Sequence, residues 1–184
     1  MPPPTGEQIT KIIFTEQQIS ARVAELAAQI SRDYAGRDVT LLATLAGSSI
    51  FHADLARAIT LNVQLDFMKV SSYGSRTKST GVVEMTFPPS LPLEGRHIII
   101  VEDIIDTGHT AACLAEYFTD KNVASYEFCA FLNKPSRREV PNIECKYIGF
   151  DIEDVFVVGY GLDYAQRYRN LPYLATLEFI KDVT

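Results

Sequence analysis

The chain has 184 residues, 47% of them hydrophobic and 22% charged, which is typical of one globular domain with a sizeable core. Its formal net charge of −6 argues against a general nucleic-acid surface, so an anionic ligand must be bound locally, by backbone N–H groups, a few cations or metal ions. No apolar run approaches the ~20 residues of a membrane span, so no membrane partner is expected. The first residues, MPPPTGEQIT, do not resemble a secretory signal.

The cysteines are Cys113, Cys129 and Cys145, an odd number at wide spacing and without a CxxC pattern. This usage is typical of buried thiols in a reducing compartment, and we expect a cytoplasmic protein. A zinc site is not expected, because neither the cysteines nor the histidines follow a ligand spacing.

The first predicted element is a helix that begins after Thr15, because Gln18 follows at the spacing of a capping box. Apolar residues then recur at helical spacing, and Gly36 is the predicted end of the helix. Residues 39–45 form a continuous apolar run, which is typical of a buried strand, and a turn of small residues follows at 46–49.

The rest of the chain alternates in the same way. Further strands are predicted at residues 63–70, 82–87, 97–101, 126–132, 147–150 and 156–158, and further helices at 50–59 and 110–118. The long polar loop at 71–81 is typical of a functional or mobile segment. The alternation predicts an α/β fold in a single domain, residues 1–184, with a mainly parallel sheet flanked by helices. Ligands of such sheets bind beyond the carboxyl ends of the strands.

One of these strand ends, VEDIIDTGHT at residues 101–110, combines acids with a small, donor-rich turn. Backbone N–H groups at a helix start bind anions, and Gly108 lets a phosphate approach the backbone. Glu102 and Asp103 would repel that phosphate, but they suit sugar hydroxyls or Mg²⁺. The stretch therefore fits a phosphorylated sugar. The alternative is that the acids are solvated and Thr110 caps the helix.

The same stretch resembles the phosphoribosyl diphosphate binding motif of type I phosphoribosyltransferases, and VEDIIDTG is similar to its version in hypoxanthine-guanine phosphoribosyltransferases. Further segments agree in the family's order: the turn at 45–48, SSYG at 71–74, FLNKPSRR at 131–138, and residues 147–173. The resemblance covers most of residues 40–173. It implies the type I phosphoribosyltransferase fold, with a hood formed by parts of the termini, mainly 147–184.

The resemblance implies an enzyme that joins hypoxanthine or guanine to phosphoribosyl diphosphate, giving IMP or GMP and diphosphate, with Mg²⁺ as cofactor. A homodimer or homotetramer is expected. The ribose- and phosphate-binding residues that it implies are Glu102, Asp103, Asp106, Thr107, Gly108, His109 and Thr110, of which His109 stands at a variable position. The diphosphate-binding residues are Ala46, Gly47, Ser48 and Arg169. The carboxylates facing the metal are Glu102, Asp103 and Asp163, and the lid residues are Ser72 and Tyr73.

Asp106 matches the family's proposed catalytic acid/base, which accepts the proton of purine N7 as that nitrogen becomes the nucleophile. Its alternative role is the N-cap of a helix beginning at Thr107. Lys134 matches the donor to the purine 6-oxo group, which selects an oxo over an amino substituent; the alternative is a solvated surface lysine.

Phe156 matches the ring that stacks on the purine, and Val157 matches the backbone that contacts its edge. Judged alone, Phe156 is a core aromatic in a strand pattern. Asp163 and Arg169 have a similar alternative, as ordinary surface charges.

The chain departs from the family at the diphosphate loop, where Leu45-Ala46-Gly47 replaces the common Leu-Lys-Gly. Family members have a non-proline cis peptide before the lysine, and the sequence does not show whether Leu45-Ala46 keeps it. The substitution removes a positive charge, while the backbone N–H groups of 46–48 remain. We therefore predict that diphosphate binding persists and depends more on Mg²⁺ and Arg169.

Other functions stay open beside this one. They are transfer to xanthine, adenine or a pyrimidine, and a non-catalytic, nucleotide-sensing RNA-binding regulator with the same fold. Lys134 together with FVVGYGLDY favours a 6-oxopurine, and the isoelectric point of about 5.1 argues against RNA. A phosphoribosyl diphosphate synthase shares the sugar-phosphate motif, but its repeated halves are not visible here.

Overall fold

A computed structural model describes residues 7–72 and 83–179, and its largest element is a six-stranded sheet of order β4-β3-β2-β5-β6-β7. The strands are β2 (Val39–Thr44), β3 (Val63–Ser72), β4 (Val83–Phe87), β5 (His97–Ile105), β6 (Ser125–Asn133) and β7 (Tyr147–Asp151). All neighbouring strands are parallel except β4, which pairs antiparallel with β3 at one edge. The predicted α/β fold with a mainly parallel sheet is confirmed.

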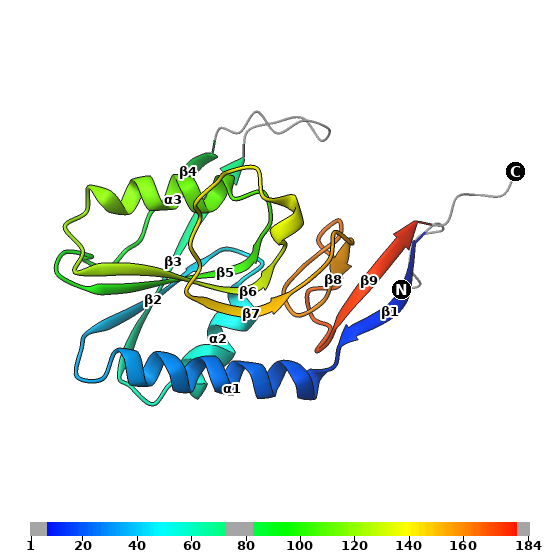
Figure 1. Ribbon diagram of the computed structural model, residues 1–184, viewed down its shortest axis with the longest axis horizontal. Coiled ribbons are helices and arrows are strands. Elements are labelled where there is room, and N and C mark those ends of the chain that lie inside the picture. Colours follow the sequence, from blue (N-terminus) through cyan, green and yellow to red (C-terminus); the bar gives the residue numbers. More distant parts are fainter. Residues whose placement is uncertain (1–6, 73–82, 180–184) are drawn as a thin grey trace, which may run out of the picture.

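Helices cover both faces of this sheet (Figure 1). On one face lie α1 (Glu16–Asp33) and α2 (Ser49–Ala58), and on the other lies α3 (His109–Thr119). The short 3₁₀ helix η1 (Pro135–Arg137) follows β6. The central strand β5 is therefore buried on both sides, with Ile99 and Val101 in the core under α1 and α2, and Ile98 and Ile100 in the core under α3.

The predicted start of α1 is confirmed. The Thr15 hydroxyl accepts a hydrogen bond from the Gln18 backbone N–H at 3.3 Å, and the Gln18 side chain accepts one from the Thr15 N–H at 2.9 Å. This reciprocal capping box satisfies two backbone donors that the first turn leaves unpaired. The helix ends at Asp33, before Gly36, whose backbone is left-handed (φ 74°).

A second, three-stranded sheet joins the two ends of the chain. Its order is β1-β9-β8, from β1 (Glu7–Phe14), β9 (Leu174–Phe179) and β8 (Val157–Val158), and both pairings are antiparallel. Figure 1 shows it beside the main sheet, beyond β7. Neither β1 nor β9 was predicted, and β7, which lies within the range expected for the hood, belongs to the main sheet.

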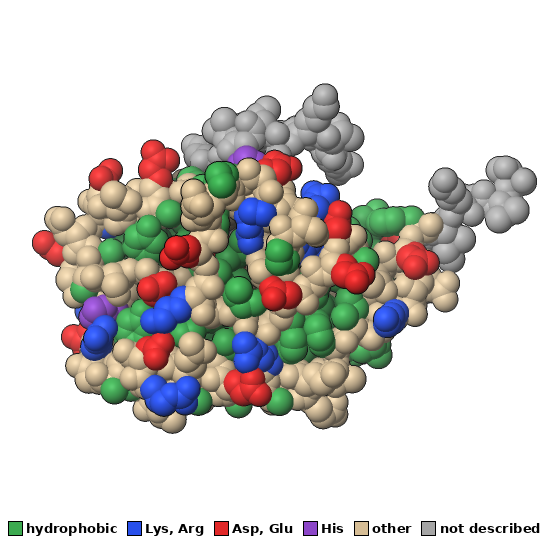
Figure 2. All heavy atoms as spheres, viewed as in Figure 1, with side chains coloured by type: hydrophobic (Ala, Val, Ile, Leu, Met, Phe, Trp, Pro, Cys, Tyr) green, Lys and Arg blue, Asp and Glu red, His purple; other side chains and the backbone are tan. Residues whose placement is uncertain are grey.

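On the face drawn in Figure 2, acidic and basic side chains are interspersed over the described residues. Within residues 7–72 and 83–179, no helix is both long and apolar enough to span a membrane.

Candidate active site at the carboxyl edge of the main sheet

Three neighbouring strands end at one edge of the main sheet, and the segments that follow them meet there. The turn 45–48 follows β2, the turn 106–108 follows β5, and Lys134 follows β6. Since β2, β5 and β6 are parallel, their carboxyl ends lie at the same edge. This edge is where the ligand was expected.

Glu102 is a buried acid within β5. The strand continues to Ile105 instead of ending at Val101, so the prediction that Glu102 follows the strand was wrong, as was the alternative that it is solvated: its exposed fraction is 5%. The Thr44 hydroxyl donates to its Oε2 at 2.5 Å, and within the described part of the chain its Oε1 has no hydrogen-bond partner. Burial, with a contribution from the neighbouring charge of Asp103, raises the pKa of Glu102 to about 8.

Asp103 lies against the turn that follows β2. Successive side chains in a strand point to opposite faces, so its carboxylate has different neighbours from that of Glu102. It is so close to Gly47 that a Cβ there would lie 1.5 Å from the Asp103 Oδ2. Burial raises the pKa of Asp103, against the lowering effects of the Ile104 N–H and the charge of Arg169. The turn and the acid are thus fitted to each other only because residue 47 is glycine.

The turn after β5 forms an open helix start. α3 begins at His109 with Gly108 as its N-cap, in the left-handed region (φ 93°) and without a side-chain cap. The alternatives of Asp106 or Thr110 as the cap are therefore wrong. A Cβ on Gly108 would also crowd Arg138 at 3.2 Å. A cavity of about 220 Å³ lies at this turn, lined by Glu102, Asp103, Ile104, Ile105, Asp106, Thr107, Gly108, Thr110 and Ala111.

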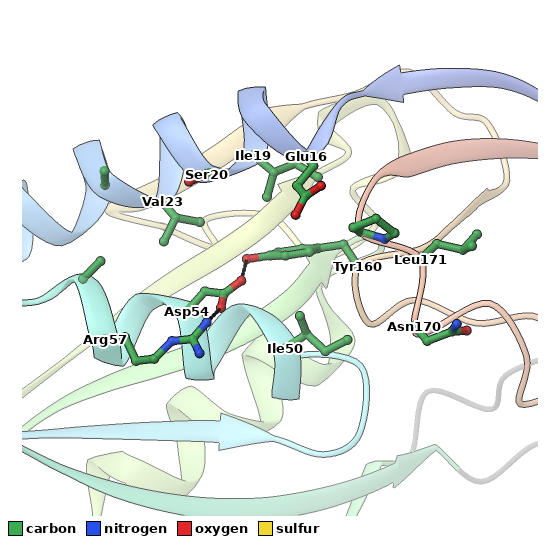
Figure 3. A pocket seen from close by; sticks show the side chains of 13 residues that line it. Glu16, Ile19, Ser20, Val23, Ile50, Asp54, Arg57, Tyr160, Asn170 and Leu171 are labelled. Carbon is green, nitrogen blue, oxygen red and sulfur yellow. Dashed lines mark hydrogen bonds and ion pairs between the residues drawn. The ribbon is translucent and has the colours of Figure 1, made fainter.

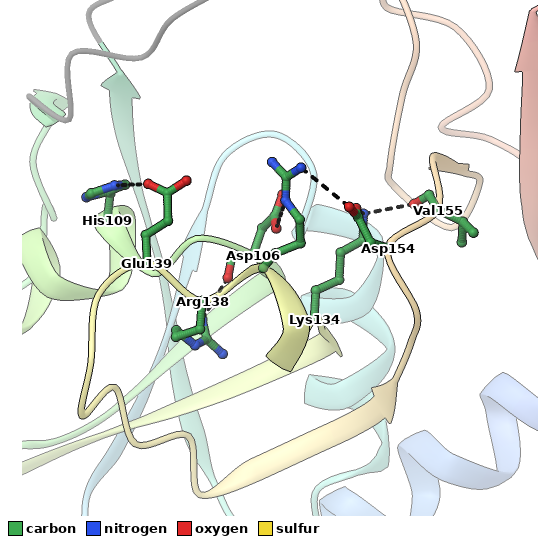
Figure 4. Close-up of polar contacts among 8 residues, drawn as sticks. Asp106, His109, Lys134, Arg138, Glu139, Asp154 and Val155 are labelled. Carbon is green, nitrogen blue, oxygen red and sulfur yellow. Dashed lines mark hydrogen bonds and ion pairs between the residues drawn. The ribbon is translucent and has the colours of Figure 1, made fainter.

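The segment after η1 supports this turn from the other side (Figure 4). The Thr107 carbonyl accepts hydrogen bonds from the backbone N–H groups of Glu139 and Val140, at 2.9 and 3.1 Å. The His109 ring and the Glu139 carboxylate pair at 2.9 Å on the exposed side of the turn. His109 thus contacts Glu139 and is absent from the residues that line the cavity.

Asp106 stands between two arginines. The Arg137 Nε lies 3.3 Å from its Oδ1, and Arg138 donates to its backbone carbonyl at 3.0 Å. Arg138 also donates to the Asn133 side chain at 2.6 Å, which ties the end of β6 to the turn. Arg137 further approaches the Asp154 carboxylate at 3.5 Å, so it bridges acids from two loops.

A second cavity, of about 210 Å³, gathers predicted base-binding residues from separate parts of the chain. It is lined by Asp103, Ile104, Asp106, Lys134, Phe156, Val157, Leu162 and Asp163. Lys134 is only 7% exposed and its ammonium donates to the Val155 carbonyl at 2.8 Å, so it is not the solvated lysine of the alternative interpretation. Phe156 is 47% exposed and is therefore not the core aromatic that its strand pattern suggested.

The remaining predicted residues are those expected to bind the diphosphate or to form the lid. Leu45-Ala46 is a cis peptide bond, and Ala46 is exposed. Arg169 pairs with Asp163 at 2.8 Å and donates to the Gly161 carbonyl at 2.7 Å. Ser72 ends β3 and nothing is described of its side chain, while Tyr73 lies outside the described residues.

Sequence reasoning missed Thr44 and the two arginines that contact Asp106. Thr44 carries a detectable signal, because it is the last residue of a strand that is otherwise largely apolar. Arg137 and Arg138 closely follow Lys134 in a segment already assigned to the base, and such a cluster of cations at a strand end is a second signal. Their link to Asp106 depends on the fold and has no local signature.

Comparisons with known proteins agree with this geometry. Residues 10–165 match the family described as the phosphoribosyl transferase domain. The chain is 45% identical over 176 residues to a hypoxanthine-guanine phosphoribosyltransferase of Mycobacterium tuberculosis, covering 92% of this chain and 87% of that protein.

Solved structures are similar over the same extent. A hypoxanthine phosphoribosyltransferase of Staphylococcus aureus superposes with a TM-score of 0.88 at 41% identity, covering 92% of each chain. A hypoxanthine-guanine phosphoribosyltransferase of Bacillus anthracis, solved with a HEPES molecule in its active site, gives 0.87 at 40% identity, covering 93% of this chain and 98% of that one.

Proposed function

The chain belongs to the phosphoribosyl transferase family, whose members are enzymes of pentosyl transfer, and from this we propose that it serves purine salvage by joining hypoxanthine or guanine to phosphoribosyl diphosphate. The products are IMP or GMP and diphosphate. One observation carries the choice of base: a single cavity is lined by the buried cation Lys134, the exposed ring of Phe156 and the acid Asp106.

In this cavity Phe156 stacks on the purine and the Val157 backbone contacts its edge. The Lys134 ammonium, which contacts the Val155 carbonyl at 2.8 Å, donates to the 6-oxo group. An amino group at that position would present a second donor to the ammonium, so adenine is disfavoured.

Asp106 is the proposed catalytic acid/base. Its carboxylate lines the cavity and accepts the proton from purine N7 as that nitrogen attacks ribose C1. The bond from C1 to the diphosphate oxygen breaks, and its electron pair leaves with the diphosphate. Arg137 holds the carboxylate at the cavity wall, 3.3 Å from its own Nε.

The ribose phosphate end of the substrate is assigned to the turn after β5. The first N–H groups of α3 have no side-chain cap and so can donate to the 5′-phosphate, as can the Thr107 and Thr110 hydroxyls. Glu102 and Asp103 accept hydrogen bonds from the ribose hydroxyls.

The diphosphate is assigned to the N–H groups of Ala46, Gly47 and Ser48, and to Arg169. Within the described residues no cluster of three or more His, Cys, Asp or Glu side chains forms a metal site. The residues nevertheless fit Mg²⁺ carried by the substrate, which needs only one or two carboxylates besides phosphate and water. The buried, unpartnered Oε1 of Glu102, with Asp103 and Asp163, supplies such oxygens, and Mg²⁺ would neutralise the leaving diphosphate.

Ser72 and Tyr73 belong to a lid that excludes water from the reacting ribose. The enzyme acts in the cytoplasm, in keeping with thiols, rather than a disulfide, at Cys129 and Cys145. It assembles as a homodimer or homotetramer, which analytical ultracentrifugation measures directly.

The test is a spectrophotometric assay with phosphoribosyl diphosphate and Mg²⁺, in which hypoxanthine, guanine, xanthine and adenine are offered separately. We expect nucleotide from hypoxanthine or guanine, and a kcat/KM for adenine lower by about 10⁴-fold. Product from adenine but not from hypoxanthine would overturn the role of Lys134. No product from any base would end the proposal.

A further inference from the structure

Tyr160 lies behind the diphosphate-binding turn, in the segment between β8 and β9. It is 5% exposed, and its ring packs against Phe131 of β6 with centroids 4.7 Å apart. Its hydroxyl donates to the Asp54 carboxylate of α2 at 2.7 Å (Figure 3). It is flanked by glycines, and all three residues 159–161 are left-handed, with φ of 103°, 46° and 100°. The chain therefore takes an uncommon path to place this side chain.

On one side of this hydrogen bond, Asp54 belongs to the helix that carries the diphosphate turn. α2 begins at Ser49, immediately after residues 45–48. The backbone N–H and the hydroxyl of Ser49 both donate to the Ala46 carbonyl, at 3.3 and 2.8 Å. A movement of α2 is thereby passed directly to the turn.

On the other side, Tyr160 is followed by the residue that touches both the turn and Arg169. Gly161 lies so close to Gly47 that a Cβ on it would be 2.0 Å from the Gly47 carbonyl oxygen. The Gly161 N–H donates to the Arg169 carbonyl at 2.9 Å, and the Arg169 guanidinium donates back to the Gly161 carbonyl at 2.7 Å. Tyr160 is thus next to the point where the two diphosphate-binding segments meet.

We infer that the hydrogen bond from Tyr160 to Asp54 sets the distance between the turn 45–48 and Arg169, and that Tyr160 is a positioning residue for the diphosphate group. The inference rests on the proposed function, which assigns diphosphate to these two segments. Neither Tyr160 nor Asp54 is assigned a contact with substrate. Their hydrogen bond acts indirectly: it fixes α2, and with it the turn that contains Gly47, relative to Gly161 and the segment of Arg169. It carries weight because this chain lacks a lysine at Ala46, so its diphosphate site depends on the placement of backbone N–H groups and one arginine.

The surroundings make the bond removable without unfolding. Asp54 and Tyr160 line a cavity of about 530 Å³ between α1, α2 and residues 170–172 (Figure 3). The Asp54 side chain is 31% exposed and also pairs with Arg57, so loss of the tyrosine hydroxyl leaves a carboxylate that is still solvated and paired. Burial raises the pKa of the Tyr160 hydroxyl, which keeps it a donor.

The test is steady-state kinetics of the Tyr160→Phe, Asp54→Ala and doubly substituted proteins, with phosphoribosyl diphosphate and hypoxanthine varied separately. We expect the KM for phosphoribosyl diphosphate, and the Kd of magnesium diphosphate measured by calorimetry, to rise about tenfold. The KM for hypoxanthine should stay within about twofold and kcat within about threefold. The double variant should be no worse than either single one, because both remove the same bond.

Tyr147→Phe is the matched control. Its hydroxyl donates to the Asp33 carboxylate at 2.8 Å, a tyrosine–aspartate bond of the same kind that joins β7 to the end of α1 instead of the diphosphate turn. It should lower the melting temperature and leave both KM values unchanged.

The outcomes separate the two hypotheses. Unchanged diphosphate affinity in an active, folded Tyr160→Phe protein overturns the inference alone, as does a fall in kcat with unchanged KM. Additive effects in the double variant also overturn it. A wild-type protein without transferase activity overturns the proposed function and the inference with it. Should Tyr160→Phe not fold, Asp54→Ala, at a partly exposed helical position, carries the same test.

Discussion

The buried carboxyl group of Glu102 lowers the stability of the folded protein, but it also leaves an oxygen atom available to a ligand. It is buried in the central strand with one oxygen bonded to Thr44 and the other without a partner among the described residues. An ionised carboxylate in such surroundings is disfavoured, which is why its pKa rises to about 8. A ligand that brings hydroxyls or a cation to the free oxygen removes that penalty.

The first prediction concerns the pH dependence of stability. The folded chain keeps a proton on Glu102 between its ordinary pKa of 4.5 and about 8, whereas the unfolded chain has lost it. The free energy of unfolding should therefore fall as pH rises through this window, by an amount on the order of a few kcal/mol. Asp103, whose pKa is also raised, contributes in the same direction.

Urea unfolding of the ligand-free protein at pH 5, 6.5 and 8.5 measures this dependence. Glu102→Gln should flatten the curve, while Glu94→Gln, at an exposed acid, should leave it as in the wild type. Parallel curves for wild type and Glu102→Gln would refute the assignment.

The second prediction concerns Asp106. Its replacement by alanine should lower kcat by about 10²- to 10⁴-fold, the range typical of a lost general base, with little change in the KM for phosphoribosyl diphosphate. Stopped-flow and steady-state assays with hypoxanthine measure it. Because Asp106 is not the helix cap, α3 should remain intact, which circular dichroism checks. A loss of less than about fivefold would reduce Asp106 to a positioning residue.

The third prediction concerns Ala46, which stands where the family commonly has lysine. Ala46 is exposed, so a longer side chain fits without repacking. Ala46→Lys should lower the Kd of diphosphate several-fold at low salt, since it adds a cation at the turn, and the effect should shrink at high salt. Ala46→Gln, which adds length without charge, is the control. An unchanged Kd in Ala46→Lys would refute the view that diphosphate binding depends more on Mg²⁺ and Arg169 because this lysine is missing.

At the scale of elements, the turn after β2 packs closely against strand β5 because residue 47 of the turn is a glycine and has no side chain. Gly47→Ala would place a Cβ 1.5 Å from the Asp103 Oδ2, so either the turn or the acid must move. We predict a fall in kcat/KM of about 100-fold, as expected for a displacement of about 1 Å in a site. Gly36→Ala is the control, because a Cβ there meets no atom within 4 Å and the left-handed backbone of Gly36 (φ 74°) is the only source of strain. It should cost only about 1 kcal/mol of stability and no activity. Equal activity losses in the two variants would contradict the prediction.

Local patterns explain which elements were predictable. The start of α1 carries its own capping signal, and the buried strands read as apolar runs, so both were predicted from short windows. The end of β5 was not, because Glu102 and Asp103 look like a strand end, and only contacts with Thr44 and Gly47 explain acids inside a central strand.

The second sheet was missed for a different reason. β1 pairs with β9, and its first residue, Glu7, pairs with Phe179, which lies near the other end of the sequence. Neither strand is recognisable without its partner. The same limit applies to the site: motif residues were named from the sequence, whereas Arg137, Arg138 and Tyr160 act through partners that are distant in sequence.

At the scale of the molecule, the second sheet joins β1 and β9 to the segment that is proposed to bind the base. β8 carries Val157 and pairs with β9, whose other neighbour is β1. Arg167 and Tyr168 both contact the Glu7 carboxylate, and the Phe14 ring stacks on Phe150 at 3.9 Å. Strand β1 thus supports the proposed base cavity, although none of the described residues of β1 lines it.

The fifth prediction follows from that support. Deletion of residues 1–13 removes the partner of β9, and it should lower the melting temperature by several degrees and raise the KM for hypoxanthine more than that for phosphoribosyl diphosphate. Deletion of residues 1–6 alone, which leaves β1 intact, is the control. Calorimetry and steady-state kinetics measure both effects. Identical behaviour of the two truncated proteins would show that β1 does not support the base cavity.

Under the proposed function, the contact between Lys134 and the Val155 carbonyl affects how the protein would discriminate between bases. The ammonium has the Val155 carbonyl as an acceptor at 2.8 Å, so in the proposed function a 6-oxo group would replace one acceptor by another and gain little binding energy by doing so. A 6-amino group offers no acceptor and would set its own N–H donors against the nearly buried ammonium, whose carboxylate neighbour, Asp154, lies 3.8 Å away. Discrimination between 6-oxopurines and 6-aminopurines would therefore come more from unfavourable binding of the amino group than from favourable binding of the oxo group. Under the proposed function, such a pocket rejects the wrong base without having to bind the right one tightly.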